Sequence, residues 1–203
     1  QLVSATALQA FAGANLAAVR NADGEWEVLQ FLTATLVASG VYELSELLRG
    51  QAGSEHAMRA PLPAGAPFVL LDDSILRLPL TGAERDLALN WRYGPATRAV
   101  GDASYVGLVH AFRGVGLRPY APAHVRGSRS GGDLALSWVR RTRIGGDGWS
   151  IAEVPLSEAD ERYEVDILDG ATVKRTIAST LPSALYTAAQ QTADFGAPQA
   201  AVS

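Results

Sequence analysis

The feature that most constrains this sequence is a set of short segments in which apolar and polar residues alternate. In residues 87–93, for example, the odd positions are Leu, Leu, Trp and Tyr, and the even positions are Ala, Asn and Arg. Successive side chains of a β-strand point to opposite faces, so this pattern is typical of a strand with one buried face. Residues 21–24 and 169–170 contain Asp-Gly, which favours tight hairpin turns. We therefore expect an all-β chain of antiparallel hairpins.

The first part of the chain contains a series of such segments at hairpin spacing. We expect strands at residues 15–20, 25–31, 41–49, 68–71, 75–80, 87–93 and 106–112. In residues 25–31, Trp26 and Val28 are expected on one face of the strand, and Glu27 and Leu29 on the other. A small antiparallel barrel or sandwich is the natural closure for strands of this length.

A connector rich in Gly and Pro separates two regions of the sequence. Residues 114–122 contain two glycines and two prolines, which is typical of a stiff linker. Beyond it the alternation begins again, and we expect strands at residues 124–127, 133–138, 161–169, 172–177 and 184–187. The sequence thus predicts two domains, at residues 1–117 and 118–203.

Composition narrows the classes of function. The net charge of -4 argues against binding nucleic acid through broad phosphate neutralisation. The chain has no cysteine, so it has no disulfide framework and no thiolate metal ligand. Its apolar stretches are short and are interrupted by Arg, Asp, Gly or Pro, so we expect no membrane insertion.

The usual catalytic motifs are missing from the sequence. The single lysine, Lys174, lies in a strand pattern, and no phosphate-binding loop or Gly-x-Ser-x-Gly elbow is present. His56, His110 and His124 are far apart and lack the spacing of paired metal ligands. We therefore predict no catalytic residue, no cofactor and no metal site, and we expect that the chain is not an enzyme.

Two acidic segments could be interpreted as functional sites, but the spacing of their residues disfavours this. Asp72 and Asp73 could form a carboxylate pair, but neighbours on a strand point to opposite faces, so a hairpin turn explains them better. Residues 145–148 with Glu153 could form a calcium loop, but they lack ligands at alternating positions. A flexible connection is the favoured interpretation of that loop.

The candidate binding residues form a basic cluster with one tryptophan: Arg140, Arg141, Arg143 and Trp149. Arginine and tryptophan are enriched at binding hot spots, so this cluster could contact a protein partner or a glycan. A solvated strand edge is the alternative that we favour, because edge charges block unwanted strand pairing. The other large aromatic residues lie on alternating patterns, and core packing is the expectation for Trp26, Tyr42, Trp91, Trp138 and Tyr163.

The second region resembles a fibronectin type III-like domain. Pro119-x-x-Pro122 stands where such domains begin. Residues 134–138 (LALSW) look like their second strand with its core tryptophan, and residues 163–167 (YEVDI) look like their third.

A wider set of motifs, in order along both regions, carries a second resemblance. The motifs are residues 26–31 (WEVLQF), 42–51 (YELSELLRGQ), 53–55 (GSE), 117–124 (LRPYAPAH) and 142–147 (TRIGGD). Together they resemble the C-terminal part of the tail-tip hub protein of alphaproteobacterial gene transfer agents and related siphophages. In that family a fibre-binding baseplate domain precedes a fibronectin-like domain.

The resemblance implies a structural role and a set of partners. It implies that the chain docks tail fibres or spikes, contacts other baseplate proteins, and works as part of a homotrimeric hub. It also implies assembly in the bacterial cytoplasm, a place at the tail tip of the particle, and action outside the cell, where a cell-surface glycan is a further candidate partner. The alternative is a carbohydrate-binding or accessory β module of a secreted or surface enzyme, because fibronectin-like domains also occur there.

One departure from the fibronectin pattern carries its own expectation. A complete sandwich of this kind has about seven strands, in sheets of three and four, and the sequence predicts about five after Pro122. We therefore expect that the chain belongs to a longer polypeptide whose remainder completes the sandwich. A chain extended beyond Ser203 should then melt cooperatively at a higher temperature.

Overall fold

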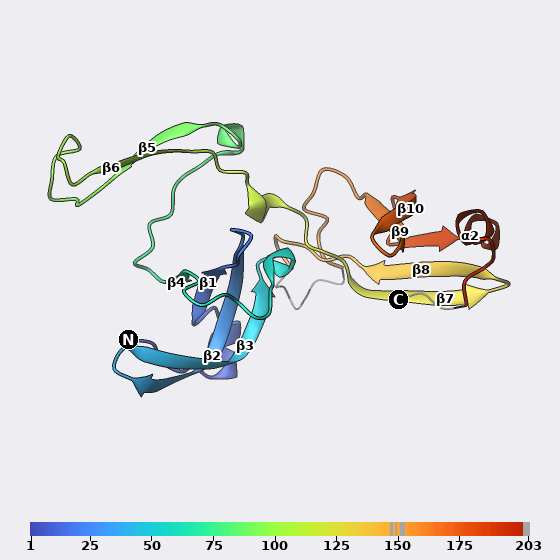
Figure 1. Cartoon of the computed structure of the whole chain (residues 1–203), viewed down its shortest axis with the longest axis horizontal. Coiled ribbons are helices and arrows are strands. Elements are labelled where there is room, and N and C mark those ends of the chain that lie inside the picture. The colour runs from blue at the N-terminus through green and yellow to red at the C-terminus, as the bar shows by residue number, and fades with distance from the viewer. Residues whose placement is uncertain (147, 149, 151–152, 201–203) are drawn as a thin grey trace. The chain divides into compact units, whose positions relative to one another are not determined.

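The computed structural model describes residues 1–146, 148, 150 and 153–200 (Figure 1). Most of its regular structure is antiparallel β-sheet, which confirms the predicted all-β fold class. The chain separates into two compact units, Gln1–Arg118 and Pro119–Ser203. We call them unit 1 and unit 2 and describe each by itself.

Unit 1 is built on a four-stranded antiparallel sheet with the strand order β3-β2-β1-β4. Its strands are β1 (Leu16–Arg20), β2 (Trp26–Ala38), β3 (Val41–Gln51) and β4 (Phe68–Leu70). The predicted turn at residues 21–24 joins β1 to β2, and Gly24 supplies its positive φ of 84°. The sheet stays open, and the described part of the chain contains no closed barrel.

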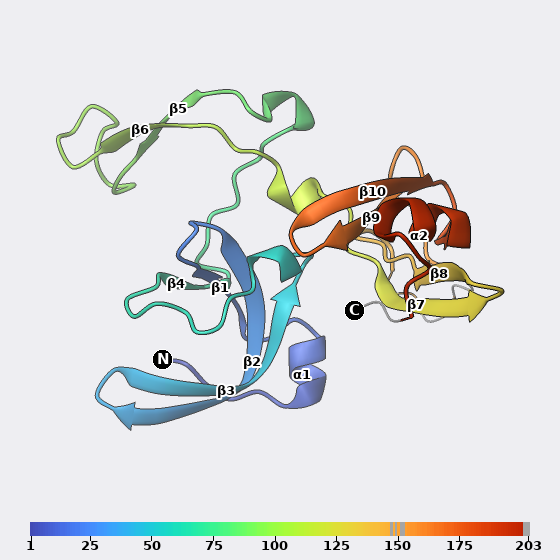
Figure 2. The same cartoon turned by 45° about the vertical axis from the view of Figure 1, so that its right-hand side comes forward.

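The β2–β3 hairpin extends well beyond the rest of this sheet. β1 pairs with β2 from Trp26 to Gln30, whereas β2 continues to Ala38. Past β1, the N-terminal segment takes over as the neighbour of β2, because the Ala5 N–H donates to the Leu32 carbonyl at 2.7 Å. Figure 2 shows the hairpin as the blue and light-blue ribbons that project past the other strands.

The core of unit 1 lies on the face of β2 that carries Glu27 and Leu29, not on the face of Trp26. Trp26 is 43% exposed, so the prediction that it packs in the core is wrong, whereas Trp138 of unit 2 is buried as predicted. Ala17 and Val19 of β1 lie opposite Leu29 and Glu27, which places all four side chains on one face. The buried cluster is Ala17, Val19 and Leu29, with Leu62, Ala66 and Leu70 packed against it.

The rest of unit 1 contains little regular structure. Strands β5 (Leu89–Tyr93) and β6 (Val106–His110) form a separate two-stranded sheet. The strand predicted at residues 75–80 is wrong, because that stretch has no ladder partner among the described residues. Asp72 accepts hydrogen bonds from the backbone N–H and hydroxyl of Ser74, and this turn leads the chain away from β4. The short helices of unit 1 are α1 (Ala7–Phe11), η1 (Glu55–Ala57), η2 (Gly82–Glu84) and η3 (Val115–Leu117).

Unit 2 contains two antiparallel sheets in its described residues. The first has the order β11-β8-β7 and consists of β7 (Ala123–Ser130), β8 (Asp133–Val139) and β11 (Ser183–Tyr186). The second is the hairpin of β9 (Tyr163–Asp169) and β10 (Thr172–Ser179). The two sheets thus hold three and two strands, at the positions where the alternation predicts strands.

Unit 2 also contains a helix after its last strand, which the alternation does not predict. Helix α2 (Ala188–Phe195) begins with a capping box, in which Thr187 and Gln190 each bond the other's backbone N–H. It ends at Gly196, which has a positive φ of 82°. The Thr-x-x-Gln spacing followed by Gly is a recognisable helix signal. Within the described residues, no helix is both long and apolar enough to cross a membrane.

Candidate functional site

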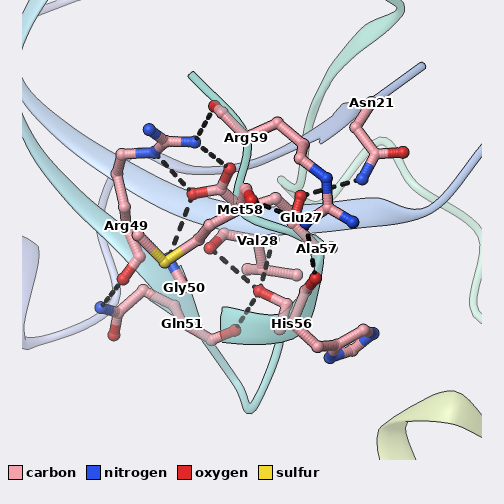
Figure 3. Close-up of polar contacts among 11 residues, drawn as sticks. Asn21, Glu27, Val28, Arg49, Gly50, Gln51, His56, Ala57, Met58 and Arg59 are labelled. Carbon is pink, nitrogen blue, oxygen red and sulfur yellow. Dashed lines mark hydrogen bonds and ion pairs between the residues drawn. The ribbon is translucent and has the colours of Figure 1, made fainter. Parts of the chain in front are cut away.

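A β-bulge in β3 organises the most buried polar cluster of unit 1 (Figure 3). Between the pairs Val28–Gln51 and Gln30–Leu48, β3 has one residue more than β2. Gly50 lies in this bulge with a positive φ of 63°. A bulge leaves a backbone group without its usual partner and bends the strand. In this bulge the Gly50 N–H needs an acceptor outside the strand ladder, and a side chain provides it.

Glu27 supplies that side chain. Its carboxylate is fully buried and accepts a hydrogen bond from the Gly50 N–H at 3.2 Å. The Arg49 guanidinium binds both carboxylate oxygens, with Nε 2.8 Å from Oε1, and this contact raises the pKa of Arg49. Arg49 also donates to the Arg59 carbonyl, so the pair ties the loop after β3 to the sheet. Both carboxylate oxygens of Glu27 thus accept hydrogen bonds from within the protein, and their role is structural.

Two further polar residues attach the same loop. Ser54 accepts a hydrogen bond from the Val28 N–H at 2.8 Å and donates to the Gln51 carbonyl at 2.7 Å. Asn21 donates to the Ala57 carbonyl at 2.9 Å. Both side chains are buried, and these bonds satisfy them. These bonds therefore attach the loop after β3 to the base of the β2–β3 hairpin. We call Asn21, Glu27, Arg49, Gly50 and Ser54 the bulge cluster.

The outer part of that hairpin presents a row of apolar side chains. Register pairs Leu36 with Tyr42 and Ala34 with Leu44, so these four residues share one face, which we call the hairpin surface. Leu36 is 55% exposed, and the other three are half-buried. The opposite face carries the polar cross-strand pair of Thr35 and Glu43, and Leu47 lies further along that face. A two-sided ribbon of this kind, apolar on one face, can bind a protein partner.

Two arginines of the predicted cluster in unit 2 form ion pairs with glutamates of the same unit. Arg140 lies 3.2 Å from Glu153 and donates to the Val154 carbonyl at 2.9 Å. Arg143 binds Glu158 at 2.7 Å, and the side chains of Arg140 and Arg143 are less than 20% exposed. Both arginines therefore have a structural use.

The remaining members of the cluster differ from this pair. The Arg141 guanidinium lies 5.0 Å from the centre of the Tyr120 ring and near the Ala121 carbonyl. Trp149 lies outside the described residues, as does Asp147 of the glycine loop. A role for this cluster in partner binding stays a prediction.

A second ionic cluster fixes helix α2 to the strands of unit 2. Arg175 of β10 binds Asp194 of α2 through two hydrogen bonds, at 2.7 and 2.8 Å. The Tyr186 hydroxyl donates to the same carboxylate at 2.9 Å. Contact with Arg175 lowers the pKa of Asp194, whereas burial and this hydrogen bond raise the pKa of Tyr186 to about 12.

The depressed pKa of Asp194 predicts an acid-dependent loss of stability. The stabilisation is complete above the ordinary pKa of an aspartate, 3.8, and is lost as pH falls through the lower folded value. Asp194→Asn should therefore be less stable than the original chain at pH 6, and the difference should shrink towards pH 2.5. Urea titrations across that pH series would measure it. A difference that does not depend on pH contradicts the assignment.

The fold defines an all-β protein made of two antiparallel units. Residues 1–69 match a family model described as Rcc01698-like, C-terminal, a family name associated with gene transfer agents and phages. The matched stretch runs from the N-terminus into β4, so it contains both the bulge cluster and the hairpin surface. No curated protein and no solved structure matches the chain.

Proposed function

We propose that this chain is a structural component of a phage-like tail tip, where it docks tail fibres or spikes and contributes to attachment to the host cell. The observation that carries the proposal is the match of residues 1–69 to the Rcc01698-like C-terminal family. The chain would act as part of a homotrimeric hub in a virion or gene transfer agent particle. It would assemble in the cytoplasm, work outside the cell and perform no catalysis.

The hairpin surface is the region of unit 1 that suits this role best. It projects past β1, it is apolar on one face, and the bulge cluster fixes its base. A protein interface gains affinity from a desolvated apolar centre with a polar rim. Leu36 and Tyr42 would form such a centre, with Ala34 and Leu44 beside them on the same face.

Particles purified from the bacterium that encodes this chain test the proposal directly. We expect peptides of the chain in the tail fraction, and we expect fibre or baseplate proteins to copurify with an affinity-tagged full-length protein. Particles that lack the chain contradict the proposal. Specific binding to a glycan array without binding to any tail protein would favour a carbohydrate-binding module instead.

Substitution at the hairpin surface tests which face makes the contact. Leu36→Asp should reduce copurification of the fibre or baseplate protein by about tenfold or more, because a charge would be desolvated in the interface. Thr35→Lys, on the opposite face of the same exposed strand, is the control: it also adds a charge, but one opposite in sign to its cross-strand neighbour Glu43, and it should retain copurification. Quantitative mass spectrometry of the tagged complexes would compare them. Equal retention by both variants places the contact elsewhere.

A further inference from the structure

Unit 1 contains a wide cleft that shares no residue with the bulge cluster or the hairpin surface. Its volume is about 1280 Å³, and all of its lining comes from residues 20–118. One wall is formed by the β1–β2 turn and η1, and the other by η2 and the segment from β6 to η3. A site that holds one small molecule usually measures about 300–1,000 Å³, so this cleft has room for several linked units.

The first wall presents an aromatic ring that the core does not use. Trp26 pairs with Arg20 across β2 and β1, so the two side chains share one face, and both line the cleft. The buried Asn21 side chain accepts a hydrogen bond within the turn and donates to the Ala57 carbonyl, which holds η1 beside the turn. Figure 3 shows that the His56 ring of η1 points away from the bulge cluster, and it also lines the cleft. The ring of Trp26 is therefore exposed on a wall that is fixed from behind.

The second wall carries arginines that have no acidic partner. Phe112 lines this wall, and its ring is held edge to face by Trp91 and His110, at centre-to-centre distances of 5.4 and 4.6 Å. Arg113 and Arg118 line it as well, and both are exposed. Within the described residues, neither guanidinium forms an ion pair or a hydrogen bond. Both are therefore available to an anion, and a guanidinium binds a carboxylate through two parallel hydrogen bonds.

Most carboxylates of the cleft already have partners in the protein. Glu84 accepts hydrogen bonds from the Thr81 N–H and hydroxyl, at 2.7 and 2.8 Å. Asp23 forms an ion pair with Arg59 at 3.0 Å. Glu25 is the remaining carboxylate in the described lining. The two unpaired arginines of the second wall outnumber it, so the cleft favours an anionic ligand over a cationic one.

An acidic saccharide combines the chemistry that these two walls can bind. The C–H groups of a sugar ring carry partial positive charge, and they stack on the electron-rich face of an indole ring. Its carboxylates suit free guanidinium groups, and its hydroxyls can bond to Glu25 and His56. Single-stranded nucleic acid also uses aromatic stacking and arginine, but the net charge of -4 opposes its binding.

We propose that this cleft binds an oligosaccharide that carries carboxylate groups, with one sugar ring on Trp26 and its acidic groups at Arg113 and Arg118. The proposal goes beyond the docking of fibres, because it concerns a different set of residues. Copurification of fibre or baseplate proteins therefore does not decide it.

Isothermal titration calorimetry of the full chain tests this binding with three acidic probes: short oligomers of galacturonate, of mannuronate and of hyaluronan. We expect at least one of them to bind, and to bind about tenfold or more tightly than its methyl ester, because esterification removes the charges that the arginines bind. In NMR spectra, the indole N–H signal of Trp26 should shift on binding and that of Trp138 should not. No binding of any acidic probe overturns the proposal, as does tighter binding of an oligothymidylate of similar length.

Substitution of the aromatic ring locates the sugar on the first wall. Trp26→Ala should weaken binding of the acidic oligosaccharide by about tenfold, whereas Trp26→Phe keeps a ring and should retain most of the affinity. Tyr93→Ala is the control, because Tyr93 is an exposed aromatic residue of unit 1 that does not line the cleft. Equal affinity in Trp26→Ala and Tyr93→Ala overturns the proposal.

Reversal of a charge tests the second wall independently of the first. Arg113→Glu should weaken binding of the acidic oligosaccharide by about tenfold or more and leave binding of its methyl ester unchanged. Arg98→Glu makes the same change of charge at an exposed position of unit 1 outside the lining, and it should have little effect. Equal losses in the two variants would show that the total charge of the chain attracts the ligand, and they overturn the assignment to the cleft.

Discussion

Glu27→Gln should lower the free energy of unfolding of unit 1 by about 3 kcal/mol, the largest single-site effect that we expect. The substitution preserves the shape of the side chain but removes the charge that faces Arg49. It also replaces one carboxylate oxygen with an NH₂ group, which is a donor. The Gly50 N–H and Arg49 are donors too, so one of them would lose its acceptor. Because Glu27 is fully buried, water cannot replace the lost acceptor.

Urea titration followed by hydrogen exchange would measure this effect in β2 and β3, where local opening reports on unit 1. Glu43→Gln is the control, since Glu43 is exposed on the same hairpin and its loss should change stability by less than about 0.5 kcal/mol. A small effect at Glu27 would mean that Arg49 and Gly50 find other acceptors. In that case the bulge cluster does not hold the hairpin.

Gly50→Ala should cost a similar amount, about 3 kcal/mol, for two separable reasons. Gly50 has a positive φ, which an L side chain adopts at a cost of about 1–2 kcal/mol. An added Cβ would also lie 2.8 Å from the Met58 Sδ and 2.9 Å from the Glu55 Cγ, which is closer than real contacts allow. Relieving such overpacking typically costs about 1–3 kcal/mol more.

Gly40→Ala separates the two contributions. Gly40 has a similar φ of 71°, but its Cβ would meet nothing within 4 Å. This control should therefore show the backbone cost alone, about 1–2 kcal/mol. Thermal or urea unfolding of the two variants side by side gives the difference due to crowding. Equal losses would show that the Met58 side chain and the loop move aside freely.

The positions of most strands could be predicted because alternation is a local property. β8 and β9 begin and end close to the expected residues, since their apolar side chains recur at every second position. β2 runs past its predicted end because its outer residues are held by β3 and by the N-terminal segment. The segment at residues 75–80 is apolar but has no neighbouring strand among the residues that the structure describes, and apolarity alone does not make a ladder.

The use of individual polar residues could not be predicted in the same way. From the sequence alone, Glu27 would be expected on the surface, because a buried carboxylate is stable only with polar partners. Those partners lie in β3, far from Glu27 along the chain. The sequence pattern indicated an exposed basic cluster at Arg140 and Arg143. Their partners Glu153 and Glu158 lie 13 and 15 residues further along the chain, so a local pattern does not show the pairing. Helix α2 had a local signal in Thr187-x-x-Gln190, which differs in period from the strands around it.

The sequence alone determined that this protein is all-β and where most of its strands lie, because both follow from the two-residue period of a strand and from local turn chemistry. The tertiary structure decided which face of β2 is buried, which arginines are paired, and that Arg175 of β10 binds Asp194 of α2. These features depend on contacts between residues distant in the chain. Such contacts depend on how the strands pair and pack, which a local sequence pattern does not determine.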